Sequence, residues 1–197
     1  MRTVFAFALF LMLAGCSTVT YYAPESDANA YRGGNACVTV VAYQASLGNS
    51  IRLFALAQPR AGGVNIIITF RVPRGESIQL LSPQFTIRSD SGAPKILNIA
   101  HVVSGSTALR IPIVKFNPTE PLRGVGRYEQ LEPPHGPDDV FLVELALATS
   151  TLPSRLEVQL PEMLANGRAV TTLPVSFILH LSSIQADFIA RFLPHFY

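Results

Sequence analysis

Three side chains that can bind a metal ion lie within five residues of one another in the second half of the chain. His135 supplies an imidazole, and Asp138 and Asp139 supply two carboxylates. A zinc site needs three or four ligands, and no second group of ligands with suitable spacing occurs elsewhere in the sequence. We therefore treat His135, Asp138 and Asp139 as weak metal candidates, and we expect no bound cofactor.

The spacing typical of nucleophilic or phosphate-binding sites is missing. Ser104-Gly105-Ser106 does not have the glycine pattern of a serine-hydrolase elbow. The glycine pairs Gly33-Gly34 and Gly62-Gly63 lack the Lys and the Ser or Thr that complete a phosphate-binding loop. We assign no catalytic residue, and the sequence favours a protein that is not an enzyme.

A basic residue, an apolar run and a pair of small residues precede Cys16 at the start of the chain. Arg2 is followed by ten residues without a polar side chain, Val4–Leu13. This length matches the apolar region of a signal peptide, whereas a membrane-spanning helix needs roughly 20 residues. The segment Leu13-Ala14-Gly15-Cys16 resembles the lipobox of bacterial lipoproteins.

The resemblance to lipoproteins implies a cellular location and a membrane anchor. It covers only the first 16 residues. It implies that residues 1–15 are removed as a signal peptide and that the sulfur of Cys16 carries a diacylglycerol. Since each buried methylene contributes about 0.8 kcal/mol, two or three acyl chains would hold the protein firmly on a membrane. Because Ser17, and not Asp, follows the cysteine, the family's sorting rule implies the outer membrane, and we expect a periplasm-facing cell-envelope protein.

The composition of the chain after residue 15 fits one domain and excludes a nucleic-acid partner. Loss of Arg2 lowers the formal net charge from +2 to +1, and no basic run remains. Cys37 is the only other cysteine. If Cys16 carries lipid, Cys37 cannot pair with it, and we expect an inert buried thiol in a strand.

Residues 16–36 have the composition of a flexible tether. They show no sustained period and are punctuated by proline and glycine. As a flexible coil, such a segment would span about 25 Å on average. Tyr21, Tyr22 and Tyr31 could instead dock on the domain or on lipid headgroups, and the sequence leaves both alternatives open.

Residues 37–181 alternate between apolar and polar positions in the manner of half-buried strands. Ile66, Ile68 and Phe70 share one face, for example, with Thr69 opposite. Glycine-containing turns separate the segments. The pattern predicts an all-β antiparallel sandwich of immunoglobulin-like architecture, with a lipocalin-type barrel as the alternative. The expected strands cover residues 38–44, 51–57, 66–72, 77–81, 84–89, 95–103, 108–116, 141–147, 156–160 and 175–181.

Residues 117–139 interrupt the strand pattern. This segment is rich in proline and charge, and connections of this length are uncommon unless they are functional or mobile. We therefore expect the 117–139 loop to be the most mobile part of the domain and to contribute an interaction surface through Arg123, Arg127 and Tyr128.

The tail, residues 182–197, predicts a short amphipathic helix that ends before Pro194. Phe188 and Phe192 fall on one side of this helix. We expect them to pack against one end of the sandwich, with an exposed stripe for a partner or a membrane surface as the alternative.

Two functions are compatible with these features. The first is a lipid-anchored envelope protein whose β-sandwich is a binding or structural module for an envelope protein or glycan. The alternative is an envelope hydrolase or a small-ligand carrier with its site near the 117–139 loop. A filled core would favour the first function, and an apolar cavity with converging His and Asp side chains would favour the second.

Overall fold

The chain folds almost entirely into antiparallel strands. The structure is a computed structural model that describes residues 18–35, 38–48, 50–90, 92–104, 113–126 and 138–183. The strands form three sheets, and one short 3-10 helix, η1 (Asp27–Asn29), follows the first strand. The strands are β1 (Thr18–Pro24), β2 (Ala30–Asn35), β3 (Val38–Leu47), β4 (Ile51–Arg60), β5 (Gly63–Val72), β6 (Ser77–Leu80), β7 (Gln84–Ser89), β8 (Gly92–Asn98), β9 (His101–Ser104), β10 (Ile113–Lys115), β11 (Leu122–Arg123), β12 (Asp139–Ala148), β13 (Arg155–Gln159), β14 (Met163–Ala165), β15 (Arg168–Val170) and β16 (Val175–Ser183).

The larger layer is a seven-stranded sheet in the order β10-β9-β12-β5-β4-β3-β2. Its long strands are specified by the alternation of apolar residues. In β5, Ile66, Ile68 and Phe70 are fully buried, while Ile67 and Thr69 between them are only partly buried. Because side chains alternate between the two faces of a strand, this pattern places one apolar face against the second layer.

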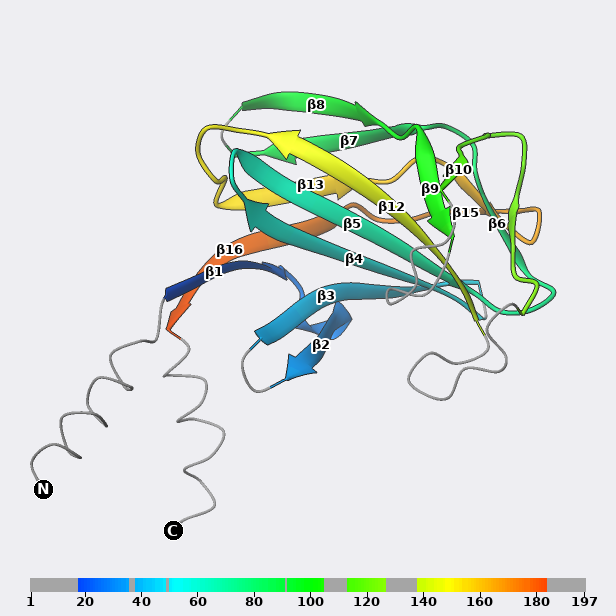
Figure 1. Cartoon of the computed structure of the whole chain (residues 1–197), viewed down its shortest axis with the longest axis horizontal. Helices are drawn as coiled ribbons and strands as arrows, with labels where there is room; N and C mark the ends of the chain where they lie inside the picture. The colour runs from blue at the N-terminus through cyan, green and yellow to red at the C-terminus, as the bar shows by residue number, and fades with distance from the viewer. Residues whose placement is uncertain are drawn as a thin grey trace, which may run out of the picture.

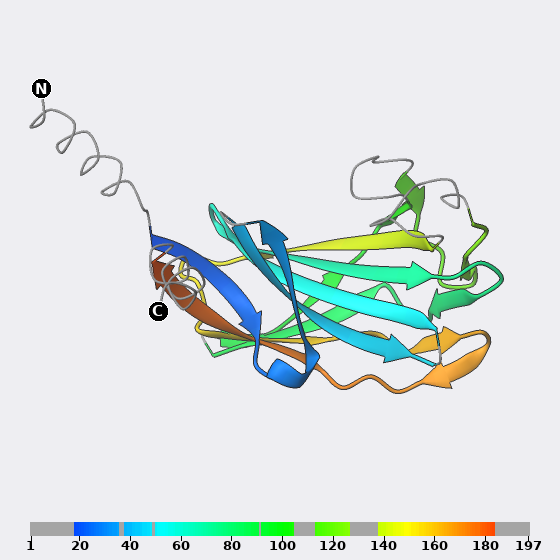
Figure 2. The same cartoon turned by 90° about the horizontal axis from the view of Figure 1, so that it is seen from below.

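The second layer is a five-stranded sheet in the order β1-β16-β13-β7-β8. Phe85, Leu156 and Phe177 from this layer join the buried residues of β5 in one continuous hydrophobic core. Figures 1 and 2 show the strands of the two layers running roughly along the long axis of the molecule. The antiparallel sandwich is therefore confirmed, and among the described residues none of the three sheets closes into the lipocalin-type barrel.

A third, four-stranded sheet lies at one end of the sandwich, in the order β11-β6-β14-β15. Its strands are two to four residues long. Figures 1 and 2 place this end sheet opposite the end where β1 begins and β16 finishes. The two ends of the sandwich therefore differ. At one end β1 begins and β16 finishes, and the other end is formed by short strands and turns.

The expectation of a tether over residues 16–36 is wrong for residues 18–35. Residues Thr18–Pro24 pair antiparallel with the last strand, from Thr18 opposite Ser183 to Pro24 opposite Phe177. Residues Ala30–Asn35 pair with β3. The pairing of β1 with β16 joins segments far apart in the sequence, so a local sequence period does not reveal it. The pairing of β2 with β3 is instead a hairpin between consecutive strands.

The three tyrosines of this segment dock on the domain. Tyr22 is 1% exposed and belongs to the core. Tyr21 stacks on His180 with ring centroids 5.4 Å apart, and Tyr31 meets Phe54 edge to face at 5.8 Å. These aromatic pairs connect β1 to its neighbour β16 and β2 to β4, across β3.

Several other expected boundaries also differ from the structure. The helix expected from Ser182 is wrong at its start, because β16 continues to Ser183 against β1. Phe188 and Phe192 lie outside the described residues. The expected strand 95–103 is divided into β8 and β9 near Ile99, whose backbone N–H donates to the carbonyl of Pro83.

Candidate functional site

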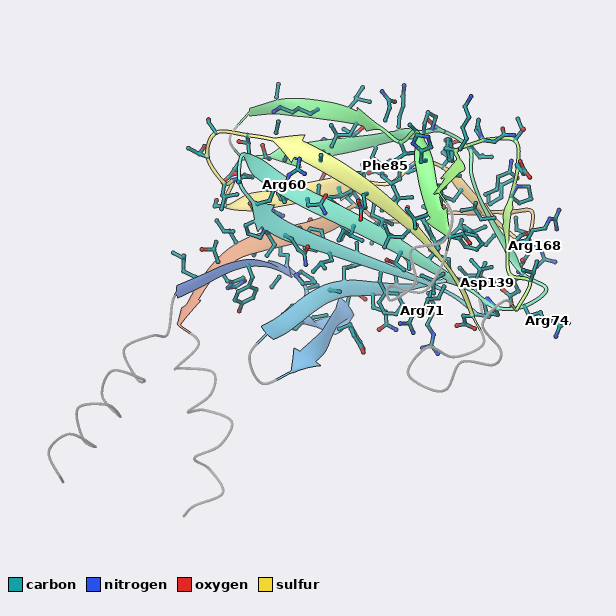
Figure 3. All side chains as sticks on the ribbon, viewed as in Figure 1. Arg60, Arg71, Arg74, Phe85, Asp139 and Arg168 are labelled. Atoms are coloured by element: carbon teal, nitrogen blue, oxygen red, sulfur yellow. The ribbon has the colours of Figure 1, made fainter. Side chains whose placement is uncertain are left out.

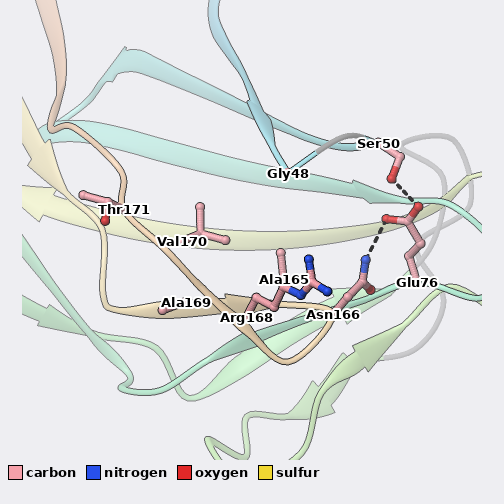
Figure 4. A pocket seen from close by; sticks show the side chains of 9 residues that line it. All are labelled: Gly48, Ser50, Glu76, Ala165, Asn166, Arg168, Ala169, Val170 and Thr171. Carbon is pink, nitrogen blue, oxygen red and sulfur yellow. Dashed lines mark hydrogen bonds between the residues drawn. The ribbon is translucent and has the colours of Figure 1, made fainter.

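A cleft of about 650 Å³ opens at the end of the sandwich that carries the four-stranded sheet. It lies between the turn that joins β3 to β4 and the hairpin formed by β14 and β15 (Figure 4). Its volume is within the range of protein sites that bind small molecules or peptide segments. The cleft is lined by Gly48, Ser50, Glu76, Ala165, Asn166, Arg168, Ala169, Val170 and Thr171.

The carboxylate of Glu76 joins three separate turns at one side of the cleft. The Ser50 hydroxyl, from the β3–β4 turn, donates to Glu76 Oε1. Asn166 Nδ2, from the β14–β15 hairpin, donates to Glu76 Oε2 at 3.2 Å (Figure 4). Because each carboxylate oxygen can accept a further hydrogen bond, Glu76 keeps acceptor capacity toward the cleft.

Asn166 is held in position by its backbone as well as by its side chain. Its φ of 51° is in the left-handed region, which Asn tolerates better than most residues and which a two-residue hairpin turn requires. Its backbone N–H donates to the Ser77 carbonyl at 2.9 Å, and its Oδ1 accepts from the Ser77 N–H at 2.8 Å. Asn166 therefore extends the β6–β14 pairing by one residue and fixes the hairpin beside Glu76.

Arg168 provides the positive charge of the cleft. It is the first residue of β15 and is exposed (Figures 3 and 4). Within the described ranges its guanidinium makes no hydrogen bond or ion pair. A guanidinium presents a planar fork of donors that matches a carboxylate, so Arg168 is suited to bind an anionic group of a ligand.

The described part of the 117–139 loop is anchored by Asp139. This side chain is 1% exposed, and its Oδ2 accepts hydrogen bonds from the backbone N–H groups of Val125 and Gly126, the latter at 3.0 Å. Asp139, the first residue of β12, therefore fixes the backbone at Val125 and Gly126 beside the start of that strand. Asp138 precedes it and is half-buried.

Gly124 fixes the same loop against the end sheet. Its N–H donates to the Glu76 carbonyl and its own carbonyl accepts from the Gly75 N–H, both at 2.9 Å. A Cβ atom at Gly124 would lie 2.0 Å from the Pro73 carbonyl oxygen, so only glycine fits. Thus β6 lies between the loop on one side and the hairpin with the cleft on the other.

The residues selected from the sequence are not brought together with the cleft. Arg123 is exposed in β11, at the opposite edge of the end sheet from β15. His135, Arg127 and Tyr128 lie outside the described residues, as do Cys16 and Cys37, so their roles stay predictions. Within the described part of the chain, no group of three potential metal ligands occurs.

Sequence reasoning missed the cleft itself. Glu76, Ser50 and Arg168 come from segments far apart in the sequence, and none of them belongs to a motif. The single local signal is Asn166-Gly167, a dipeptide typical of tight hairpins. It predicts the turn, but not the carboxylate that the turn contacts.

Comparison with known proteins gives no match for this chain to a family model, a curated protein sequence or a solved structure. In the ranges that the structure describes, no helix has the length and apolar character needed to cross a membrane.

Proposed function

We propose that the protein is a lipid-anchored cell-envelope protein whose β-sandwich is a binding module held close to the membrane surface. The observation that carries this proposal is the position of β1. Its first residue, Thr18, is two positions after Cys16, the proposed lipid attachment site. The sequence around Cys16 provides the anchor, and β1 provides the direct connection to the folded domain.

The short connection limits how far the domain can stand from the bilayer. A fully extended chain spans at most about 3.6 Å per residue, so the Cα atoms of Cys16 and Thr18 are separated by about 7 Å at most. A tether over residues 16–36 would instead have allowed about 25 Å on average. The end of the sandwich where β1 begins would therefore face the headgroups.

This orientation points the cleft away from the membrane. The β14–β15 hairpin of the end sheet lines the cleft. This end sheet and the start of β1 lie at opposite ends of the long axis (Figures 1 and 2). The long strands between them, such as β4 and β5, have ten residues each. At about 3.3 Å per residue they span roughly 33 Å, which would keep the cleft clear of the lipid.

The filled core and the side chains of the cleft favour a binding module over a hydrolase. The space between the layers is filled by a continuous core, with no exposed surface on Ile66, Phe85 or Phe177. In the cleft the Ser50 hydroxyl is hydrogen-bonded to Glu76, and the described lining residues include no histidine that could act as a base. The described part of the 117–139 loop is occupied by its own contacts with Asp139 and β6.

Labelling in intact cells tests the anchor. A fatty acid with a terminal alkyne is supplied to cells that make the wild-type chain, Cys16→Ser or the matched control Cys37→Ser. The wild type and Cys37→Ser should incorporate the label and fractionate with the outer membrane. Cys16→Ser should remain unlabelled and keep residues 1–15, because serine oxygen does not replace the thiolate in thioether formation. Equal labelling of all three chains would refute the anchor.

Probes at two exposed positions test the orientation. A fluorophore is attached to Leu181→Cys, near the end of β16, or to Thr171→Cys in the cleft, each in the Cys37→Ser background. Both side chains are exposed, Leu181 by 76%. In vesicles that carry a headgroup quencher, the Leu181 probe should be quenched much more strongly than the Thr171 probe. Equal quenching, or the reverse order, would contradict a cleft that points away from the membrane.

A further inference from the structure

Strand β15 ends the four-stranded sheet, and one of its edges is unpaired within the described residues. It pairs with β14, from Ala165 opposite Arg168 to Met163 opposite Val170. In a two-residue hairpin the residues flanking the turn exchange hydrogen bonds, so the next residue, Ala169, directs its N–H and C=O toward the free edge. The cleft lies along this strand, because Arg168, Ala169, Val170 and Thr171 all line it.

Two other edge strands carry features that prevent pairing with another chain. Strand β8 contains Pro94 and Lys95, and a proline and a lysine are common protections of an exposed edge. Strand β1, the other edge of the same sheet, packs against β3 and β4. Strand β15 contains neither proline nor lysine.

We propose that the cleft binds an extended peptide as an additional strand alongside β15, with an acidic side chain of the peptide paired to Arg168. This inference rests on the proposed function as a binding module and names the chemistry of the partner. The free backbone groups of β15 would supply the affinity that is common to strand addition, and the side chains along the cleft would supply the selectivity.

The charged side chains of the cleft, Arg168 and Glu76, favour a peptide that carries an acidic residue. Arg168 is exposed and unpaired within the described ranges, so a carboxylate would find a cation that no other described side chain neutralises. Glu76 is already fixed by Ser50 and Asn166 and keeps capacity for an N–H donor from the peptide. Both features fit a peptide, which carries N–H donors throughout, better than a free inorganic anion.

The dimensions of the site indicate a short segment. The four residues Arg168–Thr171 extend over about 13 Å at roughly 3.3 Å per residue. A peptide of four or five residues would cover this length, and the cleft volume of about 650 Å³ accommodates such a segment. The half-buried Val170 offers an apolar contact beside the charged one.

Retention of defined peptide libraries on the full chain in detergent micelles tests the inference. The acidic library has glutamate at the centre of a blocked pentapeptide and random residues elsewhere. One comparison library replaces the glutamate by glutamine, and another keeps glutamate but methylates alternate backbone nitrogens. Peptides retained on the immobilised protein are quantified by mass spectrometry. The acidic library should be retained at least tenfold more than either comparison library.

Matched variants locate the binding. Arg168→Gln should remove the preference for glutamate, whereas Arg60→Gln, an exposed arginine at the opposite end (Figure 3), should not change retention. Ala169→Pro removes the N–H at the free edge and should lower retention at least tenfold. Ala169→Val keeps that N–H and should retain the peptides. Circular dichroism establishes that each variant is folded.

Three results would overturn the inference. The first is equal retention of the acidic and glutamine libraries by the wild type, including the case in which neither is retained. The second is retention that Arg168→Gln and Ala169→Pro leave unchanged while both remain folded. The third is equal retention of the N-methylated library, because it would indicate a site for a carboxylate alone and no added strand. None of these results depends on acylation, so a failure of the peptide site is distinguishable from a failure of the lipid anchor.

Discussion

The Tyr22 hydroxyl donates a hydrogen bond of 2.8 Å to the backbone carbonyl of Pro153. These residues are 131 positions apart in the sequence, and the bond joins β1 to the loop that precedes β13. Since the Tyr22 ring is 1% exposed, the bond forms inside the protein. It identifies the first described strand as an integral part of the sandwich.

Removing the Tyr22 hydroxyl and removing the whole ring should have different costs. Tyr22→Phe leaves the Pro153 carbonyl without this donor and should lower the free energy of unfolding by about 1 kcal/mol. Tyr22→Ala also removes a ring from the core and should lower it by about 3–5 kcal/mol. Denaturant titration of both variants provides the measurement. Wild-type stability in Tyr22→Ala would mean that β1 does not belong to the folded domain.

The same residue predicts a loss of stability at alkaline pH. Burial, and to a smaller extent the charge of Asp90, raises the pKa of Tyr22 from 10.0 to about 12. The folded protein therefore retains a proton that the unfolded chain releases, so stability is full below pH 10 and falls as the pH rises to about 12. Denaturation midpoints at pH 9 and pH 11 should differ less in Tyr22→Phe than in the wild type. An identical loss in both proteins would contradict the shift.

The strands that the sequence predicts are those that bury a long apolar face. The alternation continues from Val64 to Val72 in β5 and from Phe141 to Ala148 in β12, and it specifies both the strand and the face that packs. Strands β11, β14 and β15 have only two or three residues, too few for a period to appear. Strand β1 depends on its partner β16, so its sequence resembles a tether until the rest of the fold is known.

Replacement of Asn166 should separate its backbone role from its side-chain role. Asn166→Gly keeps access to the left-handed conformation but loses the side-chain hydrogen bonds to Ser77 and Glu76, and it should cost about 1 kcal/mol. Asn166→Ala also places a Cβ residue at a φ of 51° and should cost about 1 kcal/mol more. Chemical denaturation measures both values. Equal stability of the two variants would contradict a requirement for the left-handed turn.

The contacts of Gly124 predict which arginine of the 117–139 loop resists protease. Arg123 lies in β11, next to the close approach of Gly124 to Pro73, so trypsin should spare it in the wild type. Gly124→Ala should displace this segment and expose Arg123 to early cleavage. Gly92→Ala is the matched control, because a Cβ atom there would meet nothing within 4 Å. Early cleavage at Arg123 in the wild type would contradict the anchored loop.

The mass of the N-terminal peptide of protein purified from membranes tests the proposed anchor most directly. We expect the mature chain to begin at Cys16, with a diacylglycerol joined to its sulfur by a thioether and with Thr18 two residues further on at the start of β1. A chain that begins at another residue, or an unmodified Cys16 at the N-terminus, would contradict the central claim that lipid holds the sandwich at the membrane surface.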